Sequence, residues 1–224
     1  YVAIKGGHNF ECHNHNDVGQ FIVYTDGRPA LVDAGVEAYT AKTFSDRRYE
    51  IWTMQSSWHN LPSIDGVQQG DGREFAADGV RYEADDAHAL LSLNIAGAYP
   101  AAAGAQRWQR TARLDRGRTQ RLTLTDAYEL KHDVGEIVMH LLTPCDVSLD
   151  EPGMIDLQPR VLDDDRTSGA LRIAFDAGLF DVTTETRTLA DERMAQVWGG
   201  RLVRISLRIA SPGRAGEYTL TFSQ

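Results

Sequence analysis

The chain has 224 residues, which is long enough for one large all-β domain with a substantial core. It carries 32 Asp and Glu residues against 23 Lys and Arg residues, a formal net charge of −9. This balance argues against nucleic acid or an anionic membrane as a partner, because both require a basic surface. No apolar run approaches the roughly 20 residues that span a bilayer, and no signal peptide is visible.

The chain begins with Tyr1 and not with Met, so we expect it to be part of a longer protein. Any targeting signal of that protein is then missing, and its compartment stays open, with the cytoplasm favoured over secretion. Cys12 and Cys145 are too few and too far apart for a disulfide framework, and we predict two free thiols.

The first predicted element is a hairpin. Residues 21–25 and 30–33 are β-prone, and Asp26-Gly27 between them is the strongest short hairpin signal because both turn positions favour positive φ. The same pair recurs at Asp65-Gly66, Asp71-Gly72 and Asp78-Gly79. Further strands are predicted at residues 80–83, 89–96, 107–114, 121–131, 136–142, 171–175, 181–186, 202–210 and 217–222.

This series of short strands favours an all-β fold, an antiparallel β-sandwich with little helix. The one helix candidate is short, at residues 45–54. Pro152-Gly153 and the acidic run at residues 163–165 are typical of loops and not of linkers, and no internal repeat interrupts the pattern. We therefore predict a single domain over residues 1–224.

Histidines and one aspartate form a candidate metal site. His13 and His15 are two residues apart, so their side chains point the same way if the backbone there is extended. Asp33 ends the predicted hairpin, and His59 follows later beside Asn60, whose amide can hold a neighbouring loop. Two imidazoles and a carboxylate suit Zn²⁺ and leave a fourth position open. We predict that His15, Asp33 and His59 bind zinc and that His13 is free to contact a substrate; the alternative is that they are unrelated loop residues.

A second pattern competes with this interpretation. Gly7, His13, His15, Gln20 and Gly27 fall close to the first cupin motif, in which a glutamate normally stands where Gln20 is. Cupins bind a metal inside a β-barrel. The second cupin motif is not found after Gly27, so a cupin-like metalloenzyme is kept only as an alternative.

The chain resembles a known family at several motifs. The run HNHND at residues 13–17, the strand pair that ends in Val32-Asp33-Ala34-Gly35, Tyr39, and the run SWHN at residues 57–60 resemble the C-terminal domain of the heparinase II/III-like polysaccharide lyases. That group includes heparinase II and the oligoalginate lyases. The likeness extends less specifically through residues 110–142. It implies a β-sandwich stacked against an N-terminal α/α toroid, with a zinc ion near the cleft between the two.

The resemblance also implies roles by position. The same three residues match zinc ligands, and His13 matches a catalytic histidine that faces the cleft. Tyr39 most nearly matches a cleft tyrosine, with Tyr49 as a competitor. The implied reaction is β-elimination from a uronic acid: polar groups stabilise the developing charge, a Tyr or His removes the C5 proton, and an acid protonates O4. The implied partners are an acidic polysaccharide or oligosaccharide and the toroid, without which we expect little turnover.

A non-catalytic carbohydrate-binding or structural sandwich, in which the metal only holds loops together, is the main alternative to a lyase. Lys42, Arg47 and Arg48 are candidates to contact a sugar carboxylate, although a solvated face is the simpler interpretation. The arginines at positions 107, 110, 113, 116, 118 and 121 follow neither a strand face nor a helix face and predict a solvated hairpin. We predict a hydrogen-bonded core position for His140 and assign no role to His8, His88 or His132.

Overall fold

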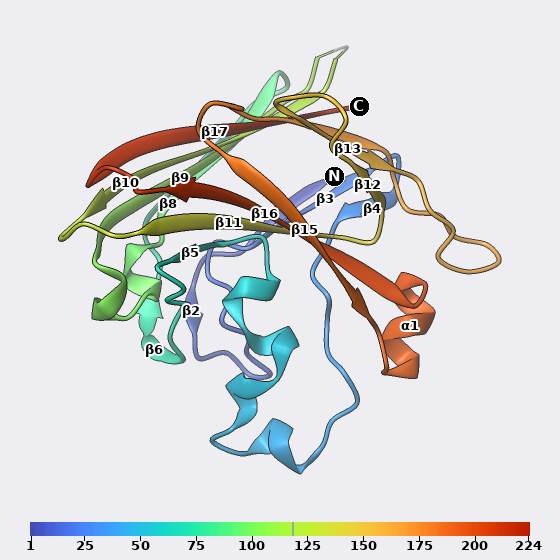
Figure 1. Cartoon of the computed structure of the whole chain (residues 1–224), viewed down its shortest axis with the longest axis horizontal. Helices are drawn as coiled ribbons and strands as arrows, with labels where there is room; N and C mark the ends of the chain where they lie inside the picture. The colour runs from blue at the N-terminus through green and yellow to red at the C-terminus, as the bar shows by residue number, and fades with distance from the viewer. Residues whose placement is uncertain (118) are drawn as a thin grey trace.

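The computed structural model describes residues 1–117 and 119–224 and confirms the predicted all-β sandwich. Two curved antiparallel sheets stack on one another, and a long connection that precedes β5 lies beneath them (Figure 1). The single α-helix among the described residues lies at the lower right of this view. No described helix is long and apolar enough to cross a membrane.

The larger sheet has eight strands in the order β12-β13-β14-β17-β10-β9-β8-β7. Its strands are β7 (Asp78–Ala84), β8 (His88–Asn94), β9 (Ala105–Asp115), β10 (Arg121–Leu130), β12 (Asp146–Ser148), β13 (Met154–Gln158), β14 (Leu171–Ala174) and β17 (Ala215–Ser223). Alternate side chains of β10 are buried, among them Leu122, Leu124 and Tyr128, because successive side chains of a strand point to opposite faces. This sheet therefore turns one face toward the core.

The opposing sheet has the order β15-β16-β11-β5. Its strands are β5 (Pro62–Ile64), β11 (Glu136–Thr143), β15 (Asp181–Thr188) and β16 (Arg201–Ala210). Two smaller sheets complete the fold, one with β1 (Val2–Ile4), β3 (Phe21–Thr25) and β4 (Arg28–Leu31), the other with β2 (His8–Asn9) and β6 (Gly72–Ala76). Phe21 and Leu31 from the first of these pack into the main core with residues of both large sheets.

The predicted hairpin is present as β3 and β4. Asp26 and Gly27 both have positive φ, 50° and 75°, as the turn requires. Asp65 and Gly66 adopt the same conformation after β5. The pair Asp78-Gly79 does not form a turn between strands: it lies within β7, where the register against β8 shifts. A positive φ at Gly79 there accompanies a bulge and not a hairpin.

The helix predicted at residues 45–54 is wrong. This stretch contains two separate 3₁₀ turns, Arg48–Glu50 and Trp52–Met54, with extended backbone at Ile51 between them. Further 3₁₀ turns lie at Ala41–Phe44, Ser56–Trp58, Ala96–Ala98 and Ala101–Ala103. The second turn buries Trp52, Thr53 and Met54, whereas the first buries none of its residues.

The α-helix that the structure contains, α1 (Glu192–Trp198), was not predicted. It begins after Asp191, whose carboxylate accepts a hydrogen bond from the Met194 backbone N–H (2.9 Å). It ends at Gly199, whose φ of 70° is a common way to terminate a helix. A second apolar cluster joins this helix to the connection before β5 and consists of Val32, Ala34, Trp52, Trp58, Leu142, Leu189, Met194, Trp198 and Leu202.

The predicted solvated hairpin is correct for most of its arginines but wrong for Arg110. The side chains at 107, 113, 116 and 121 are exposed, whereas Arg110 is completely buried and Arg118 lies outside the described residues. Arg110 shares the inward face of β9 with Trp108 and Ala112, and Asp126 stands directly opposite it on β10. The guanidinium donates to both carboxylate oxygens of Asp126, at 2.8 and 2.7 Å. Because Asp126 neutralises the guanidinium, the charge of Arg110 can be buried in the core.

Candidate metal centre

The structure brings His15, Asp33 and His59 together from three separate loops. One ligand atom of each residue lies within 4.8 Å of the other two. The rings of His15 and His59 have centroids 5.4 Å apart, and His59 Nδ1 lies 3.0 Å from Asp33 Oδ2. His59 is buried, whereas His15 and Asp33 are partly exposed. The cluster is therefore closed on one side and accessible on the other.

Local backbone structure places each of these side chains. Asp33 follows β4, and its Oδ1 accepts a hydrogen bond from the Gly35 backbone N–H at 2.7 Å, which fixes the bend after the strand. His59 ends the last 3₁₀ turn before β5. The backbone around His13 and His15 is not extended, contrary to our expectation: His13 has φ of 61°. The two side chains therefore lack the parallel arrangement that alternate residues of an extended strand have.

Without a metal, the charges of His59 and Asp33 favour one another. Burial opposes the charge on His59, but the adjacent Asp33 carboxylate outweighs burial and raises the pKa of His59. Burial would raise the pKa of Asp33, but His59 and His15 outweigh it and hold that pKa well below its usual range. Burial, followed by repulsion from His59, lowers the pKa of His15 to about 4. His15 is thus a neutral imidazole at physiological pH, the form that binds metals.

These residues fit a zinc ion. Neither ring nitrogen of buried His59 has an aligned hydrogen-bond partner among the residues that the structure describes. Such unsatisfied polar atoms are costly in a protein interior, and a metal bond would satisfy one of them. Two imidazole nitrogens and one carboxylate oxygen are also a donor set that zinc takes while keeping a fourth position open.

A buried polar network holds His59 through its neighbour Asn60. The Asn60 side chain donates to Phe21 O (2.5 Å) and accepts from the Leu142 backbone N–H (2.7 Å). The Asn60 carbonyl accepts a hydrogen bond from Arg110, which also donates to Gly19 O. The Asn60 amide was predicted to hold a neighbouring loop; these hydrogen bonds instead join β3 to β11 beside His59. Arg110 was not predicted to take part in this network, although its place two residues from both Trp108 and Ala112 was a usable signal of an inward position.

His13 and Tyr39 form a pair at the exposed rim of the cluster. Their rings stack with centroids 5.8 Å apart and an angle of 8° between planes, and Tyr39 Oη lies 3.1 Å from His13 Nδ1. Tyr39 is 44% exposed, and Phe44 packs against its far side. Tyr49, the competing tyrosine, instead accepts a hydrogen bond from the Asn14 side chain (3.3 Å). Of the two tyrosines, only Tyr39 is hydrogen-bonded to His13.

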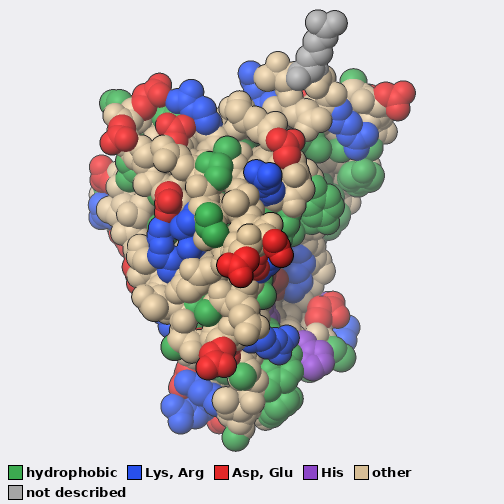
Figure 2. Space-filling model, turned by 90° about the vertical axis from the view of Figure 1, so that its right-hand side faces the viewer, with side chains coloured by type: hydrophobic (Ala, Val, Ile, Leu, Met, Phe, Trp, Pro, Cys, Tyr) green, Lys and Arg blue, Asp and Glu red, His purple; other side chains and the backbone are tan. Residues whose placement is uncertain are grey.

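The basic residues near this rim are already engaged. Lys42 and Arg47 both pair with Glu50, at 2.9 and 2.8 Å. Arg48 donates to the carbonyls of Asn14 and Thr43 and so ties the 3₁₀ turns to the histidine loop. Figure 2 shows Lys and Arg side chains scattered among Asp and Glu on the face that carries α1, with no continuous basic patch. This agrees with the solvated-face interpretation for Lys42 and Arg47, whereas Arg48 has a structural role that was not predicted.

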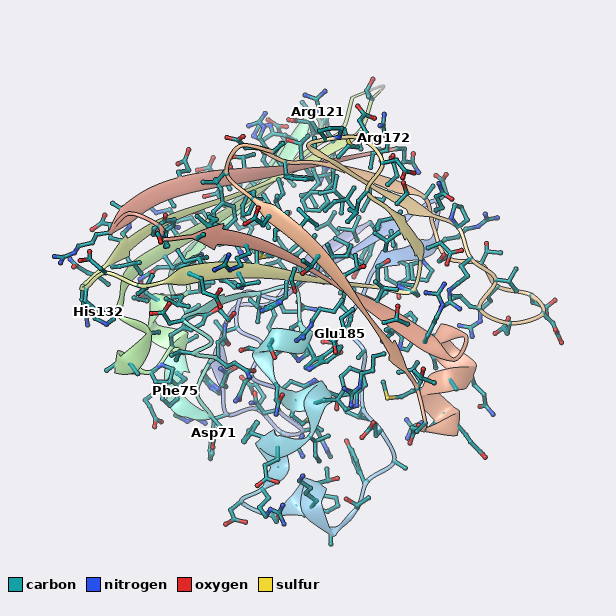
Figure 3. The ribbon with its side chains drawn as sticks, in the orientation of Figure 1. Asp71, Phe75, Arg121, His132, Arg172 and Glu185 are labelled. Atoms are coloured by element: carbon teal, nitrogen blue, oxygen red, sulfur yellow. The ribbon has the colours of Figure 1, made fainter. Side chains whose placement is uncertain are left out.

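The remaining candidates lie apart from the cluster or have structural partners. Gln20, the residue at the cupin glutamate position, is buried and accepts a hydrogen bond from the Asn60 backbone N–H (2.5 Å), which does not support the cupin-like alternative. His140 is a buried core histidine between Ser63 and Ser206, as predicted. His132 lies at the left end of the sandwich in Figure 3, opposite the helix.

Comparison with known proteins gives a consistent result. A family model described as heparinase II/III-like, C-terminal, matches residues 2–196. The chain is similar in fold to the heparan sulfate lyase HepC from Pedobacter heparinus, with a TM-score of 0.74 and 14% identity over 99% of this chain and 32% of that one. It is also similar to a heparinase III, with a TM-score of 0.70 and 13% identity over 99% of this chain and 32% of the other. The chain thus spans about a third of the length of these proteins. No curated protein matches it in sequence.

Proposed function

Because this chain belongs to the heparinase II/III-like C-terminal family, we propose that it is the zinc-binding β-sandwich of a polysaccharide lyase. Its substrate is a uronic-acid-containing polysaccharide or oligosaccharide, which is cleaved by β-elimination. The observation that carries the proposal is the convergence of His15, Asp33 and His59 beside the exposed pair of His13 and Tyr39.

The His13–Tyr39 pair is suited to move a proton. In β-elimination a base takes the proton from C5, the C–H electrons form the C4=C5 double bond, and the bond from C4 to O4 breaks as O4 is protonated. A hydrogen bond between Tyr39 Oη and His13 Nδ1 lets one group hold a proton while the other is free to accept one. Both side chains are in reach of solvent and hence of a bound sugar.

His15, Asp33 and His59 would hold a zinc ion, which would supply fixed positive charge near this pair and tie three loops together. The remaining groups of the cleft come from the N-terminal α/α toroid of the parent protein. Since one wall of the cleft then lies outside the 224 residues, we expect little turnover from this chain alone.

The test combines metal content with product formation. Protein purified without chelator should contain about one zinc ion per chain, and His15→Ala and His59→Ala should lose it. Joined to its N-terminal domain, the protein should release an unsaturated uronate, detected by ultraviolet absorbance. His13→Ala and Tyr39→Phe should keep the zinc and lose most of this activity.

The same measurements separate the proposal from its alternatives. A zinc-loaded parent protein that binds uronates but forms no unsaturated product would favour a non-catalytic carbohydrate-binding sandwich. Zinc that is retained after loss of His15 and His59 together would contradict the assigned ligands.

A further inference from the structure

A pocket with no assigned role lies on the α1 side of the metal cluster. It has a volume of about 360 Å³ and opens between His15 and residues 34–36 on one side and α1 on the other. The helix contributes Arg193, Met194, Val197 and Trp198. The lining is therefore mostly apolar, with one imidazole and one guanidinium. We call it the α1 pocket.

Arg193 is the cation of this pocket, and its charge is available. The basic residues on the opposite rim are neutralised by Glu50 or bound to carbonyls. Within the described part of the chain, by contrast, the Arg193 guanidinium has no ion-pair or hydrogen-bond partner, and its side chain is exposed. The net charge of −9 repels anions at long range, and Arg193 also lies near the Asp191 carboxylate, whose pKa it helps to lower, so attraction of an anion to this arginine is confined to the pocket itself.

The walls of the α1 pocket are held in place from both ends of the helix. At its start, Asp191 accepts hydrogen bonds from the backbone N–H groups of Ala38 (2.7 Å) and Met194 (2.9 Å). At its end, the Trp198 indole donates to Ala34 O at 2.9 Å, and Arg160 donates to the Trp198 carbonyl at 2.7 Å. The helix and the segment after Asp33 therefore form one rigid unit, and a preformed pocket loses little entropy on binding.

We propose that the α1 pocket is a subsite for a sugar unit that carries an anionic group, carboxylate or sulfate, and that Arg193 binds this group. Exposed Val197, backed by the buried Met194 and Trp198, offers an apolar surface to the carbon face of the sugar ring. The planar guanidinium presents a fork of N–H donors that fits either anion. This inference rests on the proposed function, because it places the sugar next to His15.

The experiment measures binding by calorimetry on the zinc-loaded chain with three probes: an unsulfated glucuronate disaccharide, its sulfated counterpart, and the carboxyl-reduced neutral disaccharide. Arg193→Ala should weaken binding of an anionic probe about tenfold and leave the neutral probe unchanged. Arg193→Lys should recover part of the loss, since it keeps the charge but not the fork. Arg121→Ala is the matched control, because Arg121 is also exposed and lies at the top of Figure 3, far from α1.

Arg193-dependent binding of the unsulfated probe identifies a carboxylate subsite, and dependence confined to the sulfated probe identifies a sulfate subsite. Equal losses for Arg193→Ala and Arg121→Ala, or equal losses for anionic and neutral probes, would overturn the inference. Binding of both anionic probes that survives Arg193→Ala overturns the subsite alone. A zinc-loaded chain that binds none of the probes overturns the subsite, whereas the role in a lyase is tested separately by product release from the protein joined to its N-terminal domain. Thermal unfolding of each variant verifies that the exposed substitutions leave the fold intact.

Discussion

Asn60 is the residue on which the presentation of His59 depends. Its side chain satisfies Phe21 O and the Leu142 N–H inside the core, and its carbonyl accepts from Arg110. Asn60→Ala leaves buried polar groups without partners, each at a cost of about 1–3 kcal/mol. We expect the free energy of unfolding to fall by at least about 2 kcal/mol and zinc affinity to fall about tenfold or more. Urea unfolding and competition with a chromophoric chelator measure the two effects, and unchanged zinc affinity would contradict this role.

A second prediction concerns His140 and the pH dependence of the free energy of unfolding. Burial, together with the nearby Arg204 charge, lowers its pKa from 6.5 to about 3. Between these two values the unfolded chain binds a proton that the folded chain does not, so His140 makes stability fall as the pH falls. From pH 7 to pH 5 the contribution lost is about 2 kcal/mol.

The measurement is urea unfolding at both pH values in the presence of chelator, so that metal release does not contribute. His140→Gln should lose less stability on acidification than the unaltered chain. An identical pH dependence of the two proteins would show that His140 does not remain neutral in the fold.

At the same scale, the gathering of His15, Asp33 and His59 could be predicted from residue type and motif. The pairing of His13 with Tyr39 could not, because it depends on a left-handed backbone at His13 that residue type does not specify. The fully buried Arg110 was missed because the prediction treated six arginines as one set by their spacing, whereas burial of this one depends on its pairing with Asp126 across two strands.

Among the elements, α1 is the clearest case of a helix that sequence periodicity does not predict. It has seven residues, of which only Met194 and Trp198 are buried, so its apolar face is too short to give a helical period. Tertiary contacts stabilise it, since an isolated helix of this length is not stable in water. The stretch at residues 45–54 has a stronger helical pattern, yet it forms two 3₁₀ turns, of which only Trp52–Met54 is buried.

The N-cap of α1 gives a prediction for the element. Asp191 joins the helix to the segment after Asp33 through the backbone N–H groups of Met194 and Ala38, and these hydrogen bonds lower the pKa of Asp191. Asp191→Ala should lower the free energy of unfolding by about 1–2 kcal/mol. Asp191→Asn, which retains an acceptor oxygen, should lose less. Thermal unfolding compares the two variants, and equal losses would argue against a capping role.

For the whole molecule, the strands were easier to predict than their arrangement. Alternating apolar residues locate β10 and β17, but nothing local indicates that these two strands, far apart in the sequence, pair along nearly their whole length. That pairing is decided by burial of both apolar faces against β11 and β16 in one core. The sandwich class follows from the strand pattern, whereas the order of its strands does not.

The buried ion pair of Arg110 and Asp126 joins the larger sheet to the loops of the metal cluster. Arg110 donates to Gly19 O and Asn60 O, while Tyr218 on β17 donates to Asp126 at 2.8 Å. Arg110→Ala leaves a buried carboxylate without its counter-charge, and we expect it to cost about 3–5 kcal/mol. Replacement of both partners, Arg110→Met with Asp126→Leu, should cost much less. Urea unfolding distinguishes the two, and a double variant as unstable as the single one would contradict this explanation.

Removal of the metal should affect the stability of the entire domain. His15, Asp33 and His59 lie in three loops that a bound zinc ion would join, and an ion that binds only the folded chain would stabilise it by mass action. At a free zinc concentration about 1,000 times the dissociation constant this amounts to about 4 kcal/mol, which for a chain of this size is on the order of 10 °C in Tm.

A chelator should therefore lower the Tm by that amount, and added zinc should restore it. Acidification should release the metal in the same way, because protons compete for the two imidazoles and the carboxylate. His15→Ala is the control, since it should unfold at one temperature whether zinc or chelator is present. If the unaltered chain is equally insensitive to zinc, then the three residues meet without binding a metal, and the domain is stabilised by its core and by the Asn60 network alone.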